Sequence, residues 1–531
     1  METTTIEKKS IGNTIYNWAF SVDHKKIGIM YFVFSAIMAC IGGYLAGIIR
    51  TQLWSPAGDL VSQEMFNQAT TIHATIMIFF VVIPAFNGFG NFFVPLLIGA
   101  RDMAFPRINS FAFWLAVPAA VLMIASFFVE GGAQAAGWTA YPPLSGSKYS
   151  AGPGVDMWIF SLHTIGLSSI LGAVNYIVTI LNMRAKGMTL MKMPLYVWTW
   201  LVTASMILIA TPVLSAALTM LLTDRMFGTG FLLTDKGGDP LLYQHLFWFY
   251  SHPAVYIMVL PGFGAASQIL ASFSKKKIFG YHGMVYAIAG IGVIGYLVWA
   301  HHMFTSGMPA WLQVAFSALS MCIAVPTGVK IFSWIATIWG GTIRFTVAMK
   351  MSLGFVGMFV IGGFGGVVLA NVPMDIQLHD SYFVVGHFHQ VLSSAALLMI
   401  FASTYYWAPK MFGKFMSEKI GNLVFWLFFI GSNTTFLSQH VLGLLGMPRR
   451  IANYVARPEF KDLNQLATIG YFLMAIAGIL FLYDLISTWM RKQETELSAD
   501  PWEVNDIQET LEWTIPSPPP EYNFEKEPEI K

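Results

Sequence analysis

Charged side chains are scarce in this chain. Only 11% of its 531 residues are Asp, Glu, Lys or Arg, whereas 56% are hydrophobic. Soluble proteins carry about 25% charged residues, so the composition excludes an ordinary soluble protein and indicates an integral membrane protein. The formal net charge of +2 is close to neutral and gives no indication of nucleic-acid binding.

Cysteine is almost absent. Cys40 and Cys322 are the two cysteines, and both lie in apolar runs. Two isolated cysteines provide neither a disulfide framework nor a thiolate zinc site. The N-terminal residues also lack the apolar core and the cleavage site of a secretory signal peptide. We therefore expect neither a disulfide-stabilised secreted domain nor a cysteine-based metal module.

Long apolar runs dominate the sequence instead. A helix crosses the bilayer core with roughly 20 apolar residues, and the chain contains about twelve such segments without a convincing internal repeat. We predict an all-α integral membrane protein whose helices form one bundle. The predicted helices span residues 27–48, 70–98, 110–130, 157–182, 197–222, 241–270, 281–303, 311–338, 350–370, 382–407, 420–443 and 466–489.

Polar segments flank the predicted helical domain, which covers residues 27–489. Residues 1–26 are expected to be a cytoplasmic N-terminal segment, and residues 490–531 a polar, Pro-rich cytoplasmic tail that is extended or becomes ordered on a partner. Lys and Arg are more frequent in the loops on the side of the termini, as in residues 275–277. The positive-inside rule therefore places both termini in the cytoplasm.

Histidines are the most informative polar residues of the apolar segments. His387 and His389, in VVGHFHQVL, would point about 200° apart on a helix, so they cannot share one metal but can face two cofactors. His252 lies in another segment, and WAHHMF places His301 and His302 at the end of a third. Three imidazoles without a thiolate suit copper, iron or zinc.

A lone histidine inside a membrane is more often a packing residue than a ligand, although intramembrane ionisable residues are functional candidates. His73 stands among apolar neighbours in TIHATIMIFF and suits an axial haem ligand. His163, His245 and His440 are expected to be packing or supporting groups.

Several long motifs together resemble subunit I of the A-type haem–copper terminal oxidases. The resemblance runs from about residue 20 to the C-terminus and implies a cytochrome c oxidase that reduces O2 to water and translocates protons across a bacterial plasma membrane. The motifs are TIHATIMIFF, GFGNFFVPLLIGARDMAFPR, LLYQHLFWFYSHPAVYIMVLPGFG, VWAHHMFTSGMP, PTGVKIFSW, HDSYFVVGHFH and GLLGMPRR.

The resemblance implies a role for each of six histidines. Both haems are expected to be haem A. Adjacent residues point about 100° apart on an ideal helix, so a metal shared by His301 and His302 predicts a local distortion there. The implied ligands are His73 and His389 for a low-spin haem iron, His387 for a high-spin haem iron, and His252, His301 and His302 for the copper CuB.

Two aromatic residues accompany His252. Tyr256 follows it by four positions and therefore lies on the same helix face, where the family implies a covalent His–Tyr cross-link and a phenol that supplies an electron and a proton. An ordinary buried tyrosine is the alternative. Trp248, four positions before His252, is predicted to form a wall of the copper site.

Reduction of O2 at a buried centre needs protons, and the resemblance implies two routes from the cytoplasm. Lys330 lies near the middle of its segment, where an unpaired ammonium costs several kcal/mol; a Lys that extends to the membrane surface is the alternative. One route passes through Lys330, Thr327 and Ser267 to Tyr256, and the other begins at Asp102 and continues along Asn91, Asn109, Ser168, Ser169 and Asn175.

The motif around His252 departs from the commoner family pattern. Many relatives have a glutamate two positions after this histidine, where this chain has Ala254. It resembles instead a subgroup with Tyr–Ser before the histidine, here Tyr250 and Ser251. We predict that Tyr250, helped by Ser251, ends the Asp102 route.

The outer loops are expected to hold polar parts of the cofactors. Arg449 and Arg450 fit clamps for haem propionates because Arg binds carboxylates with paired hydrogen bonds, and Trp138 is expected to support them. The resemblance also implies a contact with a haem formyl group and a magnesium site completed by another subunit, for which a solvated loop pair is the alternative. The formyl contact is implied for Arg50, and the magnesium site for His379 with Asp380.

Partners follow from what the chain does not contain. It has neither a cupredoxin-like segment nor a CxxC motif, so a CuA centre is expected on subunit II, beside a subunit III. Quinol oxidases usually have a histidine eight positions before the low-spin haem ligand, where this chain has Met65; this favours cytochrome c, free or fused, as electron donor. The alternatives are a quinol oxidase, a nitric oxide reductase and, in a different class, a twelve-helix secondary transporter.

Overall fold

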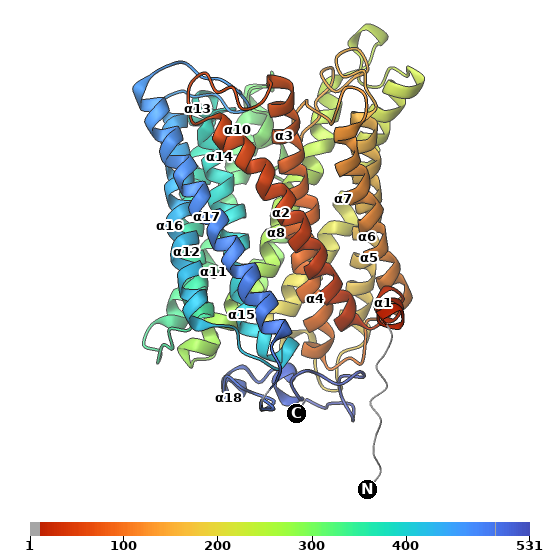
Figure 1. The fold of residues 1–531 in the computed structure, drawn as a ribbon, viewed down its shortest axis with the longest axis vertical. Helices are drawn as coiled ribbons and strands as arrows, with labels where there is room; N and C mark the ends of the chain where they lie inside the picture. The colour runs from red at the N-terminus through yellow and green to blue at the C-terminus, as the bar shows by residue number, and fades with distance from the viewer. Residues whose placement is uncertain (1–10, 494, 531) are drawn as a thin grey trace.

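The computed structural model describes residues 11–493 and 495–530 as a bundle of long helices, without strands in these residues (Figure 1). The α-helices are α1 (Ile11–Ala19), α2 (His24–Gln52), α3 (Gln63–Ile76), α4 (Ile83–Ile98), α5 (Pro106–Ala125), α6 (Gly154–Asn182), α7 (Leu195–Phe227), α8 (Pro240–Ser274), α9 (Tyr281–Ile294), α10 (Ala310–Cys322), α11 (Ala324–Ile338), α12 (Val347–Ala370), α13 (Val372–Leu378), α14 (Tyr382–Phe388), α15 (Ala395–Phe412), α16 (Glu418–Leu444), α17 (Pro458–Met490) and α18 (Asn505–Gln508). The shorter helical turns are η1 (Met77–Val82), η2 (Ser126–Phe128), η3 (Leu190–Lys192), η4 (Thr234–Lys236), η5 (Trp299–Met303), η6 (His389–Ser394) and η7 (Leu511–Thr514).

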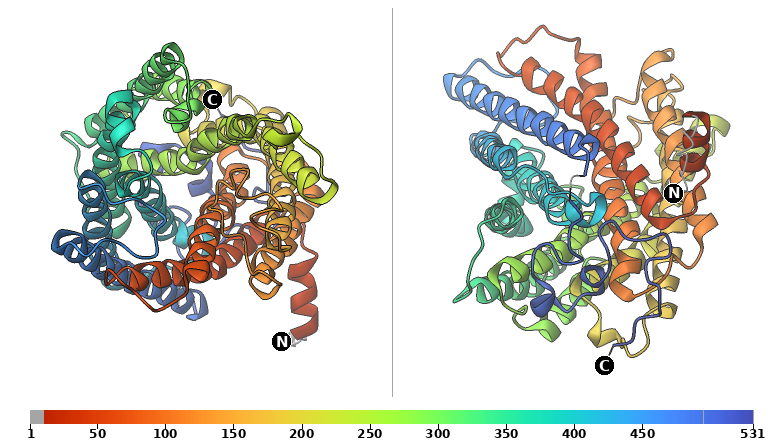
Figure 2. Two further views of the ribbon diagram at one scale, coloured as in Figure 1. Left: turned by 90° about the horizontal axis from the view of Figure 1, so that it is seen from above. Right: turned by 60° about the horizontal axis from the view of Figure 1, so that its bottom comes forward.

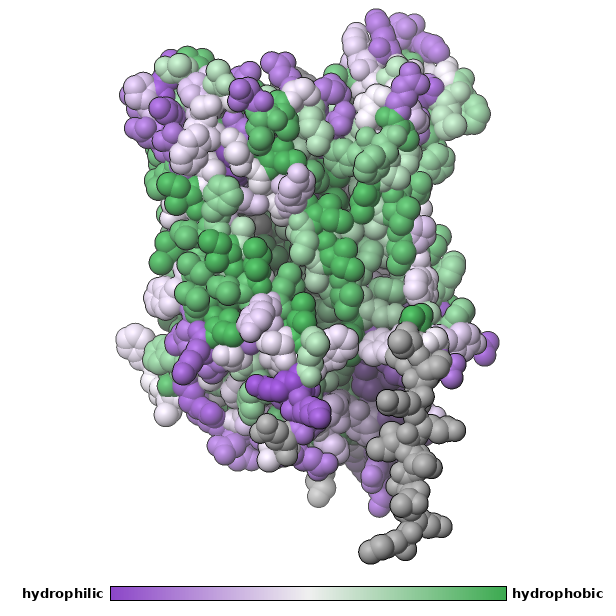
Figure 3. Space-filling view, in the orientation of Figure 1, coloured by the Kyte–Doolittle hydropathy of each residue, from purple (hydrophilic) through white to green (hydrophobic). Residues whose placement is uncertain are grey.

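The helices are long and apolar enough to cross a membrane. Eleven such helical stretches occur among the described residues, and α9 is a shorter apolar helix of 14 residues. On the face drawn in Figure 3, a broad hydrophobic band covers the middle of the molecule between two more hydrophilic ends. A bilayer core solvates such a band. The prediction of an all-α membrane bundle with about twelve helices is confirmed.

Two predicted helices contain a π-helical turn close to a histidine. The segment predicted at 70–98 begins at Gln63, and η1 separates α3 from α4. The segment predicted at 382–407 consists of α14, η6 and α15, and η6 begins at His389. A π-turn inserts an extra residue and turns the following side chains onto another face, which is frequent at functional sites.

The helix predicted at 281–303 is shorter than the sequence indicates. α9 ends at Ile294, and η5 is a separate 3-10 turn. Gly295 follows the end of α9, and a Cβ atom there would lie 2.9 Å from Cδ2 of Tyr256. The chain therefore leaves the helix beside α8, and the tighter turn carries His301 and His302.

The C-terminal tail packs against one end of the bundle, the end where α1 also lies (Figures 1 and 2). Trp513 of the tail is only 1% exposed. Lys410, near the end of α15, donates hydrogen bonds to three backbone carbonyls of the tail. The described part of the tail, which includes α18 and η7, is thus ordered on the chain's own helix ends. Residues 1–10 of the predicted N-terminal segment, together with residues 494 and 531 of the tail, lie outside the described residues.

Candidate functional site

Three histidines from two segments meet inside the bundle. His252 lies in α8, and His302, 50 positions later, lies beside His301 in η5. Nδ1 of His252 is 3.1 Å from Nε2 of His302. One ring nitrogen from each of the three lies within 4.8 Å of the others. The distortion predicted for the adjacent pair is present as the 3-10 turn.

The surroundings of these imidazoles suit metal ligands. Nδ1 of His301 donates to Oγ of Ser320 at 2.9 Å, and this hydroxyl donates to the Phe316 carbonyl at 2.6 Å. Nε2 of His252 is buried and has no hydrogen-bond partner among the described residues. A buried nitrogen without a partner requires an explanation, and ligand histidines are characteristically held through their other ring nitrogen. The group therefore fits copper, zinc or iron.

Tyr256 follows His252 by one turn of α8, as the spacing predicts. The two ring centroids are 4.8 Å apart, with an angle of 64° between the ring planes. The absence of a side chain at Gly295 gives the phenol ring its space. Tyr256 is therefore next to the histidine group.

Trp248 forms a wall of the same group. Its indole stacks on His302, and its Nε1 donates to the hydroxyl of Tyr141 at 2.5 Å. Trp138 meets the indole edge-to-face at 5.9 Å between ring centroids. The loop that contains Trp138 and Tyr141 therefore supports this wall from outside α8.

The other three predicted ligand histidines lie in α3, in α14 and at the start of η6. In each ring, Nδ1 is hydrogen-bonded to a backbone carbonyl. A carbonyl only accepts, so Nδ1 carries the hydrogen and Nε2 is the nitrogen suited to a metal. The pairs are His73 with Gly42 at 2.8 Å, His387 with Gly362 at 2.8 Å, and His389 with Val385 at 2.9 Å.

All six histidines line one cavity of about 1930 Å³. Typical small-ligand pockets measure about 300–1,000 Å³, so this space suits larger cofactors. Gly366 contributes to the space beside His387, because a Cβ there would lie 2.9 Å from Cε1 of the imidazole.

Two arginines of the loop between α16 and α17 also line this cavity. Arg449 forms an ion pair with Asp380, whose Oδ1 accepts from Nε at 2.8 Å. Arg450 has a buried NH2 without a hydrogen-bond partner among the described residues. Gly137 permits its close approach, since a Cβ there would lie 2.8 Å from NH1 of Arg450. Arg450 therefore has donor capacity for an anionic group.

The predicted magnesium pair lies next to Arg449. Nε2 of His379 is 3.7 Å from Oδ2 of Asp380. Asp375 joins this pair, because its Oδ2 is 3.2 Å from Nδ1 of His379. Burial tends to raise the pKa of Asp380, but the charges of Arg449, His379 and Arg450 and the hydrogen bond from Arg449 together outweigh this effect and leave the pKa below its ordinary value. The Asp380 carboxylate thus already has a cationic partner.

Arg50 is buried in α2 and lines the cavity. Its NH2 donates to the backbone and side-chain oxygens of Asn464, each at 3.0 Å. Its Nε and NH1 have no hydrogen-bond partner among the described residues. The guanidinium is therefore fixed at one nitrogen and retains donors for a polar substituent.

Lys330 is fully buried in α11, and its Nζ has no hydrogen-bond partner among the described residues. It lies 5.4 Å from the ring centroids of both Phe263 and Trp334. Nε1 of Trp334, a residue that was not predicted, donates to Oγ of Ser267 at 2.9 Å, so Trp334 contacts both Lys330 and Ser267, two predicted members of the route. Thr327 lines the cavity together with Tyr256.

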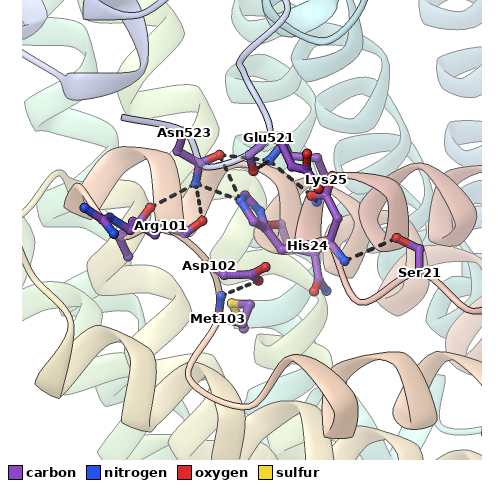
Figure 4. A network of polar contacts seen from close by, with 11 residues as sticks. Ser21, His24, Lys25, Arg101, Asp102, Met103, Glu521 and Asn523 are labelled. Atoms are coloured by element: carbon purple, nitrogen blue, oxygen red, sulfur yellow. Dashed lines mark hydrogen bonds and ion pairs between the residues drawn. The ribbon is translucent and has the colours of Figure 1, made fainter. Parts of the chain in front are cut away.

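Asp102 lies in the loop between α4 and α5, beneath the start of α2 (Figure 4). Its Oδ1 accepts from the backbone N–H of Met103 at 2.6 Å. Burial raises the pKa of the carboxyl to about 6. A carboxyl with this pKa exchanges protons near neutral pH.

The predicted asparagines of the second route partly meet. Nδ2 of Asn109 donates to Oδ1 of Asn91 at 2.6 Å, and Nδ2 of Asn91 donates to the hydroxyl of Tyr176 at 2.9 Å. Asn175 instead accepts from the backbone N–H of Phe105 at 2.9 Å. The serine hydroxyls bond to carbonyls: Ser168 to Ala112 at 2.6 Å and Ser169 to Ile165 at 3.0 Å.

Tyr250 and Ser251, the expected end of this route, line the cavity. The Tyr250 ring is stacked on Phe79 at 6.1 Å between centroids. Oγ of Ser251 is buried and has no hydrogen-bond partner among the described residues. Both side chains therefore adjoin the space between the helices.

The comparison with family models is decisive for the assignment. Residues 26–473 match the family described as cytochrome c and quinol oxidase polypeptide I. The chain belongs to this family. The predicted resemblance to subunit I of the haem–copper oxidases is confirmed, and the chain is the catalytic type of subunit. Family membership excludes the secondary transporter; the Tyr–Ser subgroup stays a prediction.

Curated relatives of the oxidase cover nearly all of the chain. A cytochrome c oxidase subunit 1 of Synechocystis sp. is 50% identical over 96% of this chain and 91% of its own. The protein of the same name from Thermostichus vulcanus is 48% identical over 97% of this chain and 91% of its own. The one from Bacillus subtilis is 43% identical over 99% of this chain and 83% of its own. A solved haem–copper terminal oxidase dimer shares the fold, with a TM-score of 0.74, 20% identity and coverage of 89% of this chain and 85% of that one.

The residues present fit the cofactors of a haem–copper oxidase. A cavity of this size has room for large planar groups, and its histidines are held through Nδ1 as axial ligands would be. The separate group of three histidines includes the orphaned His252 nitrogen, which suits a single copper ion.

Sequence reasoning missed several residues of these sites. Tyr141 accepts a hydrogen bond from Trp248, which lies 107 positions later in the chain. Asp375 bonds to His379, one helical turn away. Tyr176 extends the asparagine pair. His24, at the start of α2, is fully buried beside the Asp102 loop. Tyr176 and His24 are polar groups at or near an apolar segment, which was the available signal.

Proposed function

We propose that this oxidase subunit reduces O2 to water with electrons from cytochrome c and couples the reaction to proton translocation. The observation that carries the proposal is the group of His252, His301 and His302 beside Tyr256, in a cavity that His387 also lines. Four electrons and four protons per O2 must reach one buried place, and this cavity adjoins the polar side chains of both predicted routes.

The assignment of cofactors rests on the family resemblance, and the histidine geometry supports it. Two haems of type A and the copper CuB supply the redox chemistry and the binding of O2. His73 and His389 would hold the low-spin haem, and His387 the high-spin haem. The three histidines of α8 and η5 would hold copper, Arg449 and Arg450 would bind the propionates, and Arg50 would bond to the formyl group. Trp248 keeps the His302 ring in place by stacking.

Protons would enter by the two predicted routes. Lys330 is buried without a hydrogen-bond partner among the described residues, so its proton is held without a counterion and is transferred readily. Asp102 would collect protons at the other route, and Asn91 and Asn109 form the pair above it. Tyr250 and Ser251 would end this route where relatives use a glutamate.

Partners complete the oxidase. A subunit II would carry CuA and receive electrons from cytochrome c, free or fused, and a subunit III would join the complex. Asp375 strengthens the proposed magnesium site at His379 and Asp380. The complex would lie in a bacterial plasma membrane with both termini of this chain in the cytoplasm; α1 and the tail lie at the same end of the bundle (Figure 1).

The test is made on the purified complex. We expect A-type haem bands in the reduced-minus-oxidised spectrum, copper by elemental analysis, and O2 consumption with reduced cytochrome c. His302→Ala should lose the CuB copper and the activity, while His163→Ala, whose imidazole bonds to Thr219, should keep both.

Other spectra and donors would contradict the proposal. Activity with quinol alone would identify a quinol oxidase. B-type haem with non-haem iron in place of copper would indicate a nitric oxide reductase.

A further inference from the structure

Asn523 of the C-terminal tail lies against the loop that carries Asp102 (Figure 4). It is fully buried, and its φ angle is +62°. Asn is one of the few residues other than glycine that adopts this left-handed conformation readily. The tail thus turns at Asn523 and directs its amide into the bundle.

The amide of Asn523 is saturated with contacts. One of the two hydrogens on its Nδ2 is shared between the carbonyls of Ala100 at 2.9 Å and Arg101 at 3.1 Å, the two residues before Asp102. Its Oδ1 accepts from Nζ of Lys25 at 2.9 Å. One side chain therefore ties the Asp102 loop to the start of α2.

His24 extends this connection to the asparagine pair of the proton route. Its Nδ1 is 2.6 Å from the carbonyl of Asn91, which only accepts, so Nδ1 carries the hydrogen. Nε2 then accepts from Nδ2 of Asn523 at 2.8 Å. Asn91 in turn accepts from Asn109. The Asn523 amide is thus hydrogen-bonded to the loop that carries Asp102 and to His24, which bonds to Asn91.

Simple anchoring of the tail does not require this amide. Before Asn523, Trp513 is buried and Glu512 accepts a hydrogen bond from Gln268 of α8. After it, the backbone N–H of Ile530 donates to the Lys186 carbonyl at 2.8 Å. The tail is fixed on both sides, so loss of the amide removes contacts chiefly from the Asp102 loop and His24.

We propose that Asn523 is a positioning residue for proton uptake at Asp102. The inference rests on the proposed function, in which Asp102 begins a proton route. Asn523 holds the carbonyls before Asp102 and the ring of His24 in the arrangement that leads from the carboxyl to Asn91 and Asn109.

The experiment is a double-mutant cycle in the complete oxidase, reconstituted in liposomes. Asn523→Ala should lower turnover and proton uptake roughly tenfold, the effect expected for lost hydrogen bonds to a functional group. Asn523→Ser keeps a short donor and should recover part of the rate. In an Asp102→Asn background, Asn523→Ala should cause no further loss. Tyr522→Ala, at a side chain that is 70% exposed, is the matched control and should behave as wild type.

The outcomes separate this inference from the proposed function. If Asp102→Asn leaves turnover and proton uptake unchanged, both the Asp102 route and the role of Asn523 are wrong. If Asp102→Asn slows the enzyme but Asn523→Ala does not, or if the two losses multiply, the route stands and the role of Asn523 is overturned. Haem content and the thermal midpoint are measured for every variant. If Asn523→Ala does not assemble, Asn523→Ser is carried through the same cycle and decides by the same criteria.

Discussion

The indole of Trp248 stacks on the imidazole of His302, with ring centroids 3.7 Å apart and ring planes only 15° from parallel. Trp248 comes from α8 and His302 from η5, so this contact joins the two segments that make up the histidine group. The hydrogen bond from Trp248 to Tyr141 fixes the indole in turn. Residues that hold a metal ligand in place contribute to the affinity for the metal.

We therefore expect Trp248→Ala to weaken copper binding by roughly 10- to 100-fold. Trp248→Phe keeps a stacking ring but loses the donor to Tyr141, and should retain more copper. Copper content after dialysis against a chelator measures the difference. Trp426→Ala, on the half-exposed face of α16, is the control. Equal copper retention in Trp248→Ala and wild type would show that the stack has no role in the metal site.

Lys330→Met should separate stability from activity. The change removes an ammonium that is buried without a hydrogen-bond partner among the described residues, so the thermal midpoint should rise by roughly 2 °C or more. The loss of a proton-transfer group should lower turnover roughly 100-fold. Thermal unfolding in detergent and O2 consumption test the two effects, with Lys419→Met at an exposed site as control. Full activity in Lys330→Met would remove this residue from the route.

Tyr250→Phe tests the proposed end of the Asp102 route. The ring can still stack on Phe79, while the hydroxyl is lost. Turnover and proton release should fall together, by roughly 10-fold or more if the hydroxyl transfers protons. Stopped-flow measurements with a pH indicator in proteoliposomes follow both, and Tyr286→Phe, at an exposed tyrosine of α9, serves as control. Unchanged pumping in Tyr250→Phe would contradict the assignment.

Glu512 should make the stability of the protein depend on pH. Burial raises the pKa of this carboxyl from 4.5 to about 7. The folded state therefore retains a proton that the unfolded state releases, so the stabilisation is complete below about pH 4.5 and is lost as the pH rises to about 7. The free energy of unfolding that is lost over this pH range is at most on the order of 3 kcal/mol.

Glu512→Gln cannot ionise and should therefore gain in thermal midpoint over wild type between pH 5 and pH 8. Scanning fluorimetry at several pH values measures the gap between the two proteins. Glu509→Gln, at an exposed carboxylate that pairs with Lys277, is the matched control. A gap that does not change with pH would show that Glu512 is charged in the folded protein throughout this range.

Much of the fold could be predicted because it depends on local pattern. The apolar run at 157–182 corresponds to α6, Gly154–Asn182, and the four-residue spacing placed Tyr256 beside His252. Helical periodicity and the thickness of a bilayer fix such features within one segment. The end of α9 at Ile294 was not predicted, because the apolar run continues past it and the contact of η5 with α8 decides where the helix stops.

The sequence by itself determined the membrane bundle, the family and the identity of the histidines that are suited to bind metals. Only the tertiary structure decided that His252 and His302 approach to 3.1 Å, that Asp375 joins His379, and that Asn523 reaches the Asp102 loop across more than 400 positions. The reason is physical. Spacing within a helix is set by the local geometry of the backbone, whereas contacts between distant segments depend on how all the helices pack against one another.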